Sequence, residues 1–457
     1  MDATSATLSP MTDGLPPERR RWAILAIFTA LAMAALDTAI ANIALPAIAA
    51  DLNTTPADVI WVVNVYQITM VATLLPLAAL GEIIGHQRIY LWGLLLFTVA
   101  SLACALAWSL PSLLVARVLQ GLGGAAVMSV NTALVRFVYP SHLHGRGFGN
   151  NALVVATAYS LGPALASGIL AVASWPWLFA INIPFGVAAI LIGMKTVPAT
   201  PRAAHAFDIP GALLTSVSLC LFIVGIGSAA HKASAAMVAI ELAGAVIFGA
   251  LLIRRQAGHP APMLPIDLFS RPMFSLSVAT AVCSFAVQGL AFVSLPFYFE
   301  DVLHRTQVET GFFMTPWSIV VAIMAPIAGR LSDRHPAGLL GGLGLLLLGV
   351  GMALLAMLPP SPSVLDIIWR MAICGCGFGF FQSPNMKAIM SSAPAGRSGG
   401  ASGIVATARL IGQTIGAALA ALCFAIADRE GATWALALGA GFGALGCVMS
   451  FMRLTVR

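Results

Sequence analysis

The sequence predicts an all-α membrane protein with 14 transmembrane helices, arranged as two six-helix bundles related by a pseudo-two-fold repeat, plus two inserted helices. Three observations predict this fold: the composition, a series of long apolar stretches, and motifs that recur in the second half of the chain. Of the 457 residues, 59% are apolar and only 9% are charged, whereas soluble domains carry about 25% charge. So few charges exclude a soluble enzyme, a disordered chain and a secreted disulfide scaffold.

Each apolar stretch is long enough for a helix of about 20 residues, which crosses ~30 Å of hydrocarbon. The first stretch runs from Trp22 to about Ala50, too long for a signal-peptide core of about 7–15 residues, so we expect a retained helix. The fourteen expected spans begin near Trp22, Ala57, Tyr90, Pro111, Phe148, Phe179, Ile209, Ala236, Met273, Thr310, Ala337, Ser363, Gly399 and Thr433.

The distribution of Lys and Arg predicts the orientation. With the N-terminus in the cytoplasm, seventeen of the 23 basic residues fall in cytoplasmic segments and three fall in outer loops. The remaining three, Arg117, Arg370 and Arg409, lie inside spans. Cytoplasmic loops carry the excess of positive charge, so we expect an even number of spans and both termini in the cytoplasm. The expected location is the inner, cytoplasmic membrane of a bacterium.

Several matches at nearly one offset indicate an internal repeat. Val155–Gly162 and Val405–Gly412 share Val-Ala-Thr-Ala and a final glycine, and Pro76 recurs as Pro326. We expect a tail at 1–20, a six-helix bundle at 21–197, two inserted helices at 198–258, a second bundle at 259–454 and a short end at 455–457. Duplicated six-helix halves are typical of transporters that bind substrate between the halves.

Four segments resemble one family. Leu36–Pro46 resembles the first-helix signature of the 14-helix drug:proton antiporter branch of the major facilitator superfamily. Arg117–Ala125 is similar to the fourth-helix motif of the superfamily, Gly162-Pro163 to its antiporter motif, and Trp175–Gly186 to the helix 5–6 connection of this branch. The resemblance implies a proton-coupled exporter that works by alternating access.

The turn after the second span departs from the family pattern, because Glu82 replaces the usual aspartate. The corresponding turn in the second half, Gly329–Arg334, follows the family pattern more closely. The resemblance implies a gating role for these turns, in which charge clamps stabilise one conformational state. Gly121 is expected to let helices approach closely, and Gly162 with Pro163 is expected to bend its span. The turn residues assigned to gating are Glu82, Arg88, Asp333 and Arg334.

Ionisable residues inside spans are costly and indicate function. Asp37 and Arg117 lie at matching depths in the first and fourth spans, so an ion pair is geometrically possible. The carboxylate could couple substrate exit to proton entry, or the two could form a static structural pair. Arg409 lies near the midplane, where it could face the cavity and bind anionic groups or be anchored to backbone carbonyls. Arg370 is expected to pair with Asp366 one turn earlier.

Uncharged polar residues in the spans could line a central cavity or could form hydrogen bonds between helices. The histidines lie in loops without ligand spacing, so no metal site is expected. The cavity candidates are Asn42, Tyr66, Gln120, Asn151, Gln288, Gln382 and Asn385.

The leading hypothesis is a proton-coupled exporter of amphiphilic, cationic drugs; the alternative is an exporter or facilitator of a specific, anionic metabolite. None of the three lysines follows a glycine, so no Walker-type loop exists. Two Gly-x-Ser-Gly segments lack a later histidine, so an intramembrane serine protease is excluded. The expected partners are a small-molecule substrate, protons and the lipid bilayer, with no ATP, nucleic acid or cofactor, and the expected working unit is a monomer.

Overall fold

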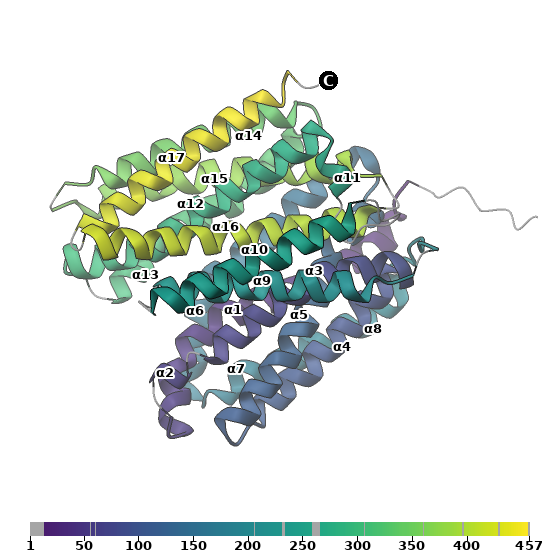
Figure 1. Cartoon of the computed structure of the whole chain (residues 1–457), viewed down its shortest axis with the longest axis horizontal. Coiled ribbons are helices and arrows are strands. Elements are labelled where there is room, and N and C mark those ends of the chain that lie inside the picture. Colours follow the sequence, from purple (N-terminus) through teal and green to yellow (C-terminus); the bar gives the residue numbers. More distant parts are fainter. Residues whose placement is uncertain are drawn as a thin grey trace, which may run out of the picture.

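The computed structural model describes residues 13–54, 56–59, 61–204, 206–230, 234–257, 266–305, 307–359, 361–394, 397–427 and 430–455. All regular structure in these ranges is helical. The chain forms two bundles of long, roughly parallel helices, with a hairpin of two helices packed against them (Figure 1). The predicted all-helical class is therefore confirmed.

The N-terminal bundle consists of six long helical segments, the last of which is broken into α7 and α8. Close helix packing depends on glycine here, because a Cβ added to Gly123 of α5 would lie 2.5 Å from the backbone of Phe97. Its elements are α1 (Pro17–Asp51), α2 (Pro56–Val59), α3 (Trp61–Ile84), α4 (His86–Ala105), α5 (Leu110–Val138), η1 (Ser141–Leu143), α6 (His144–Val172), α7 (Pro176–Ala180) and α8 (Asn182–Thr196).

The inserted hairpin consists of α9 (Ile209–Ala230) and α10 (Ala235–Gln256). Asp208 joins the ends of the two helices, because its carboxylate accepts hydrogen bonds from the Gly211 N–H at 3.1 Å, Arg255 Nη2 at 2.8 Å and Gln256 Nε2 at 2.8 Å. Burial opposes ionisation, but these hydrogen bonds and the Arg255 charge outweigh it and lower the pKa of Asp208 below its ordinary value. The hairpin is thus closed by a charged clasp between Asp208, directly before α9, and the end of α10.

The C-terminal bundle repeats the arrangement of the first. Gly344 of α14 packs directly on the backbone of α15, since an added Cβ would lie 2.7 Å from the Phe381 nitrogen. Its elements are α11 (Ile266–Phe269), α12 (Pro272–Phe297), the π-helical turn η2 (Tyr298–Val302), α13 (Gln307–Leu331), α14 (Ala337–Ala356), α15 (Val364–Ser392), α16 (Ser398–Ala427) and α17 (Gly431–Met452).

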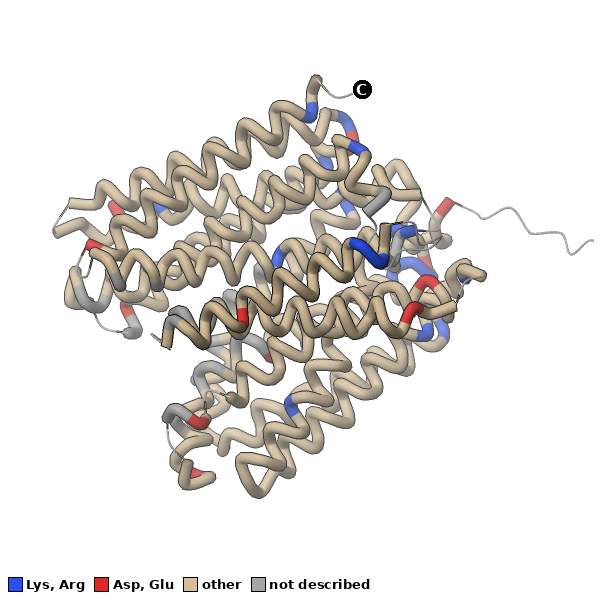
Figure 2. The backbone as a smooth tube through the Cα atoms, viewed as in Figure 1, with Lys and Arg blue, Asp and Glu red and all other residues tan. Residues whose placement is uncertain are grey.

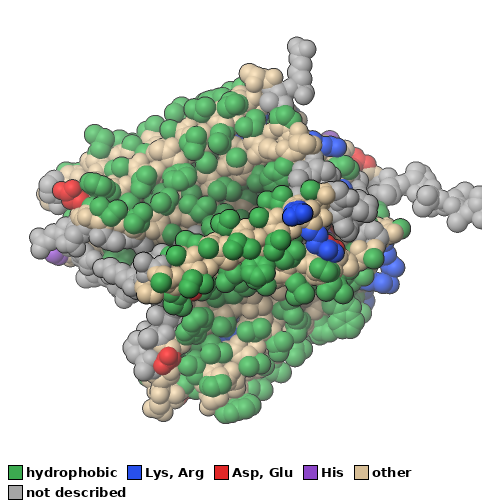
Figure 3. All heavy atoms as spheres, in the orientation of Figure 1, with side chains coloured by type: hydrophobic (Ala, Val, Ile, Leu, Met, Phe, Trp, Pro, Cys, Tyr) green, Lys and Arg blue, Asp and Glu red, His purple; other side chains and the backbone are tan. Residues whose placement is uncertain are grey.

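Within the described residues, 11 helices are long and apolar enough to cross a membrane. A helix overlaps each predicted span, but α1 and α6 are not among the 11, and α9 contributes only a shorter apolar stretch, Ile209–Gly225. Large apolar side chains cover the visible surface between the charged ends (Figure 3). The chain is therefore a multi-pass membrane protein, and the number fourteen stays a prediction.

Charge is distributed unevenly along the bundles. Lys and Arg gather at one end of the molecule, which we call the basic end (Figure 2). The bundles converge at this end and diverge toward the opposite one (Figures 1 and 2). At the basic end α6 and α13 touch through glycines, since a Cβ on Gly145 would lie 2.2 Å from the Gly329 carbonyl oxygen. A Cβ on Gly168 or Gly311, at the far ends of the same two helices, would meet no atom of the described residues within 4 Å.

Candidate transport site

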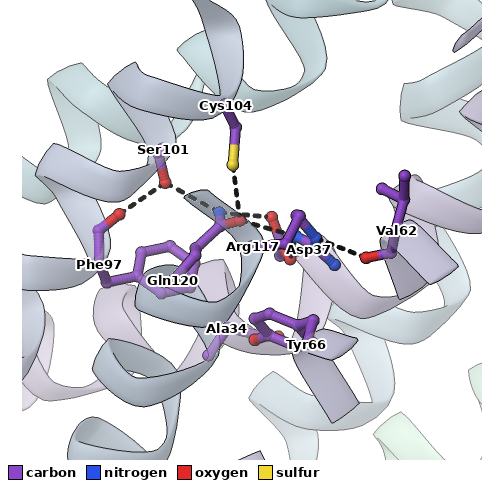
Figure 4. A network of polar contacts seen from close by, with 9 residues as sticks. All are labelled: Ala34, Asp37, Val62, Tyr66, Phe97, Ser101, Cys104, Arg117 and Gln120. Carbon is purple, nitrogen blue, oxygen red and sulfur yellow. Dashed lines mark hydrogen bonds and ion pairs between the residues drawn. The ribbon is translucent and has the colours of Figure 1, made fainter. Parts of the chain in front are cut away.

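A buried polar network joins α1 and α5 inside the N-terminal bundle (Figure 4). Arg117 Nη1 lies 2.5 Å from Asp37 Oδ2, and the two side chains are 0% and 2% exposed. Gln120, one turn after Arg117, accepts from Arg117 Nη1 at 2.7 Å and donates to Asp37 Oδ1 at 2.8 Å. The ion pair that the matching depths allowed is therefore present, and Gln120 bonds to both partners.

Arg117 is held from three further directions. Its Nε donates to the Val62 carbonyl at 2.9 Å, and its guanidinium carbon lies 4.2 Å from the centre of the Tyr66 ring and 5.4 Å from that of Phe179. Among the described residues, Arg117 Nη2 has no hydrogen-bond partner. The aromatic faces attract the cation, so the guanidinium remains favourably placed in an apolar interior.

A cavity of about 490 Å³ lies between the two bundles. Its walls come from α1, α3, α5, α6 and α9 on one side and from α12, α13, α15 and α16 on the other. Ala34, on its α1 wall, accepts a hydrogen bond from the Tyr66 hydroxyl at 3.4 Å. Since Tyr66 also stacks on Arg117, the buried ion pair and the cavity share one connecting side chain.

The described cavity wall contains three of the predicted residues, Gln288, Gln382 and Arg409. Gln120 belongs to the buried network, and Tyr66 stands between that network and the cavity. Asn151 and Asn385 instead form interhelical hydrogen bonds, with Asn131 and with Arg453 and Ser277 respectively. The side chain of Asn42 lies outside the described residues.

The wall also contains residues that the sequence did not identify. Trp317 is the largest of them, on α13, and it is 1% exposed. A usable signal existed, because Trp317 lies 250 residues after Gln67, the offset of the internal repeat, and both residues line the cavity. A cavity position in one half of a duplicated fold predicts its counterpart in the other half.

Arg409 is the one charged residue of the described cavity wall, which contains no Asp or Glu. Its Nη2 lies 3.6 Å from the Met128 sulfur, and its buried Nε has no partner among the described residues. Within that part of the chain, no backbone carbonyl accepts a hydrogen bond from Arg409, which was one of its two expected roles. Arg370, by contrast, pairs with Asp366 at 3.0 Å, as the i,i+4 spacing predicted.

At the basic end, acidic side chains of each bundle bind the start of a helix in the other. The Gly400 N–H of α16 donates to Glu82 Oε1 at 2.7 Å, and the Gly145 N–H of α6 donates to Asp333 Oδ1 at 3.0 Å. Lys387 also pairs with Asp333, at 2.8 Å. Helix N-termini carry partial positive charge, so both carboxylates connect the bundles favourably.

The other residues assigned to gating have different surroundings. Arg88 and Arg334 are exposed. A Cβ on Gly121 would lie 2.7 Å from the Tyr66 carbonyl oxygen, so this glycine packs α5 on α3. Gly162 is buried in α6, which runs unbroken through this position, and the side chain of Pro163 lies outside the described residues. Within the described part of the chain, no cluster of ligand-type side chains could hold a metal ion.

Two membrane-spanning helical bundles with a cavity between them are the architecture expected of a transporter. The family match and the transporter relatives bear this out and indicate a transporter rather than an enzyme. The chain belongs to the Major Facilitator Superfamily, whose family profile matches residues 27–417.

Three relatives are similar to the chain over most of its length, and the two with a named role differ in that role. The chain is 49% identical over 447 residues to the uncharacterized transporter YebQ of Escherichia coli K12, covering 97% of both proteins. It is 29% identical over 411 residues to the riboflavin transporter RibZ of Clostridioides difficile, covering 89% of both. It is 32% identical over 412 residues to the multidrug resistance protein Stp of Mycobacterium tuberculosis, covering 87% of this chain and 74% of that protein.

Proposed function

We propose that this transporter exports amphiphilic, aromatic small molecules across the cytoplasmic membrane in exchange for protons, by alternating access of the cavity between its bundles. The observation that carries the proposal is the buried Asp37–Arg117 pair, which is linked to the cavity wall through Tyr66 and Ala34. The riboflavin transport named for one relative supports a cargo with flat rings, and the multidrug resistance named for another supports export of small molecules.

Proton coupling follows from the chemistry of the pair. A proton on Asp37 removes the charge that faces Arg117, and an uncompensated buried charge costs about 3–5 kcal/mol. The protein lowers this cost by moving α5 relative to α1, which displaces Arg117 from Tyr66 and alters the cavity wall. Proton binding and cargo binding then act on one shared contact, which is the requirement for exchange.

The contacts at the basic end support the assignment of a conformational state. We assign the basic end to the cytoplasm because cytoplasmic loops carry the excess of Lys and Arg. Glu82 and Asp333 then close the cytoplasmic side, and the diverging ends face outward. In this proposed state cargo leaves the cavity outward.

The experiment measures proton release from everted membrane vesicles that have been acidified inside. Ethidium, a planar cation, riboflavin, a neutral flavin, and 2-naphthalenesulfonate, a planar aromatic anion, are added in turn while internal pH is followed with a fluorescent probe. We expect at least one of them to raise the internal pH in wild-type vesicles and none to do so in Asp37→Asn vesicles.

The control is Asp366→Asn, which removes an ion-paired but partly exposed carboxylate from α15, away from the cavity wall. This variant should keep the wild-type response. Cargo-driven proton release at the wild-type rate in correctly inserted Asp37→Asn protein would contradict the proposed coupling role.

A further inference from the structure

Arg409 is the one charged residue on the described cavity wall, and its guanidinium has few hydrogen-bond partners there. It offers five N–H donors in a planar fork, yet the structure gives it only one polar contact among the described residues, to the thioether of Met128 at 3.6 Å. A thioether sulfur is a weak acceptor. Its Nε is buried and unpartnered among those residues, so the fork lacks an acceptor that the described protein could supply.

The surroundings leave the positive charge uncompensated. The described lining contains no Asp or Glu, and its other polar side chains are neutral amides and hydroxyls, such as Gln288 and Gln413, which bond to each other at 2.9 Å. Placing a charge inside a membrane helix is costly, by about 2.5–3.5 kcal/mol on insertion scales. A ligand that brings an oxyanion offsets this cost, whereas a cationic ligand adds repulsion.

Aromatic rings form the wall on the C-terminal side of the cavity. The rings of Phe292 and Trp317 meet edge to face at 5.5 Å, Trp317 lies 6.2 Å from Phe378, and Phe378 meets Phe285 at 5.7 Å. These side chains come from α12, α13 and α15 and form one continuous row. The indole N–H of Trp317 is buried and unpartnered among the described residues, so it is a second free donor.

We infer that the cargo of this cavity is a planar aromatic anion, whose oxyanion group receives two hydrogen bonds from the Arg409 fork while its rings lie against Trp317 and Phe378. Arginine binds planar oxyanions such as carboxylates in this two-bond geometry. The inference concerns the cavity of the proposed exporter and selects the anionic alternative over the cationic drug class. It does not depend on proton coupling.

The test is equilibrium binding to the purified full-length protein in lipid nanodiscs, without a proton gradient. The probes are fluorescein and rhodamine 123, which share a xanthene ring system but carry opposite charge at neutral pH. Fluorescence anisotropy should give at least tenfold tighter binding of fluorescein to the wild-type protein. Arg409→Gln should lose at least tenfold in fluorescein affinity, and Arg409→Lys should be intermediate, because it keeps the charge without the fork.

The matched control is Arg254→Gln, the same substitution at an exposed position of α10 that does not line the cavity. It should leave fluorescein affinity within about twofold of wild type. Because no proton gradient is applied, the binding assay separates this inference from the proposed coupling. A wild-type preference for rhodamine 123, binding of neither dye, or unchanged fluorescein affinity in folded Arg409→Gln protein would each overturn the inference.

Discussion

Arg117 illustrates how a full charge can be stable inside a membrane bundle. Asp37 neutralises it, Gln120 bonds to both partners, and the Tyr66 ring covers its face. The interior is apolar, so each contact is stronger than it would be in water, and the loss of one partner is costly. The network therefore stabilises the N-terminal bundle in addition to its proposed role in coupling.

Stability measurements on single and double variants distinguish the loss of charge balance in the Asp37–Arg117 pair from the loss of either side chain. Arg117→Gln should lower the free energy of unfolding by about 3–5 kcal/mol, because it leaves the Asp37 carboxylate buried without its cation. Adding Asp37→Asn should recover most of this loss, because the pair is then neutral on both sides. Thermal unfolding of the purified protein in detergent checks both variants. A double variant that melts as low as Arg117→Gln alone would contradict this account.

The sequence predicted the Asp37–Arg117 pair because depth along a helix follows directly from residue position. It did not identify Gln120 as a partner of both charges, since rotation of a helix about its axis depends on packing against neighbours. The same reason explains Asn151 and Asn385, which could face a cavity or another helix and were found bonded between helices. Trp317 could have been identified through the repeat, from its counterpart Gln67.

At the scale of elements, the contact between α6 and α13 depends on two glycines. Added atoms at Gly145 would overlap the Gly329 carbonyl oxygen, at 2.2 Å, and the same holds in reverse, at 2.4 Å. A larger residue must therefore separate the helices. The basic end is then less firmly closed, and the bonds of Glu82 and Asp333 across the bundles are weakened with it.

Gly145→Ala should loosen the closure at the basic end. Overpacking typically costs about 1–3 kcal/mol, so amide hydrogen exchange at the starts of α6 and α16 should accelerate by about fivefold or more. Hydrogen-exchange mass spectrometry measures this directly. Gly311→Ala is the control on α13, since its Cβ meets no atom within 4 Å. Equal exchange in Gly145→Ala and wild type would show that the glycine contact does not hold the bundles closed.

The clasp at Asp208 predicts a response to acid. Its pKa is lowered in the folded protein from an ordinary value of 3.8. The stabilisation is therefore complete above about pH 4 and is lost as the pH falls through the lowered folded-state pKa. Below about pH 4, amides at the start of α9 should progressively lose protection in wild type, measured relative to the intrinsic exchange rate at each pH. Asp208→Asn should exchange fast throughout, and a pH profile identical to wild type in this variant would exclude the carboxylate as the cause.

At the scale of the whole molecule, the sequence predicted helices and their duplication but not which ends of the bundles meet. Apolar runs and repeats are local properties of the chain, whereas closure at the basic end is a property of one conformational state. Glu82 and Asp333 were expected in clamps, and the structure places both across the bundles, but the exposed Arg88 and Arg334 take no recorded part. The assignment of seventeen basic residues to one side agrees with their gathering at one end.

The α9–α10 hairpin belongs to neither half of the repeat, yet α9 packs against α3 of one bundle and α16 of the other. Ser216 of α9 donates to the Ala72 carbonyl of α3 at 2.7 Å, and Ile223 lines the cavity. Part of the cavity wall therefore comes from a helix that lies outside both halves of the repeat. A substitution at Ile223 is accordingly expected to reshape the cavity without changing a residue of either bundle.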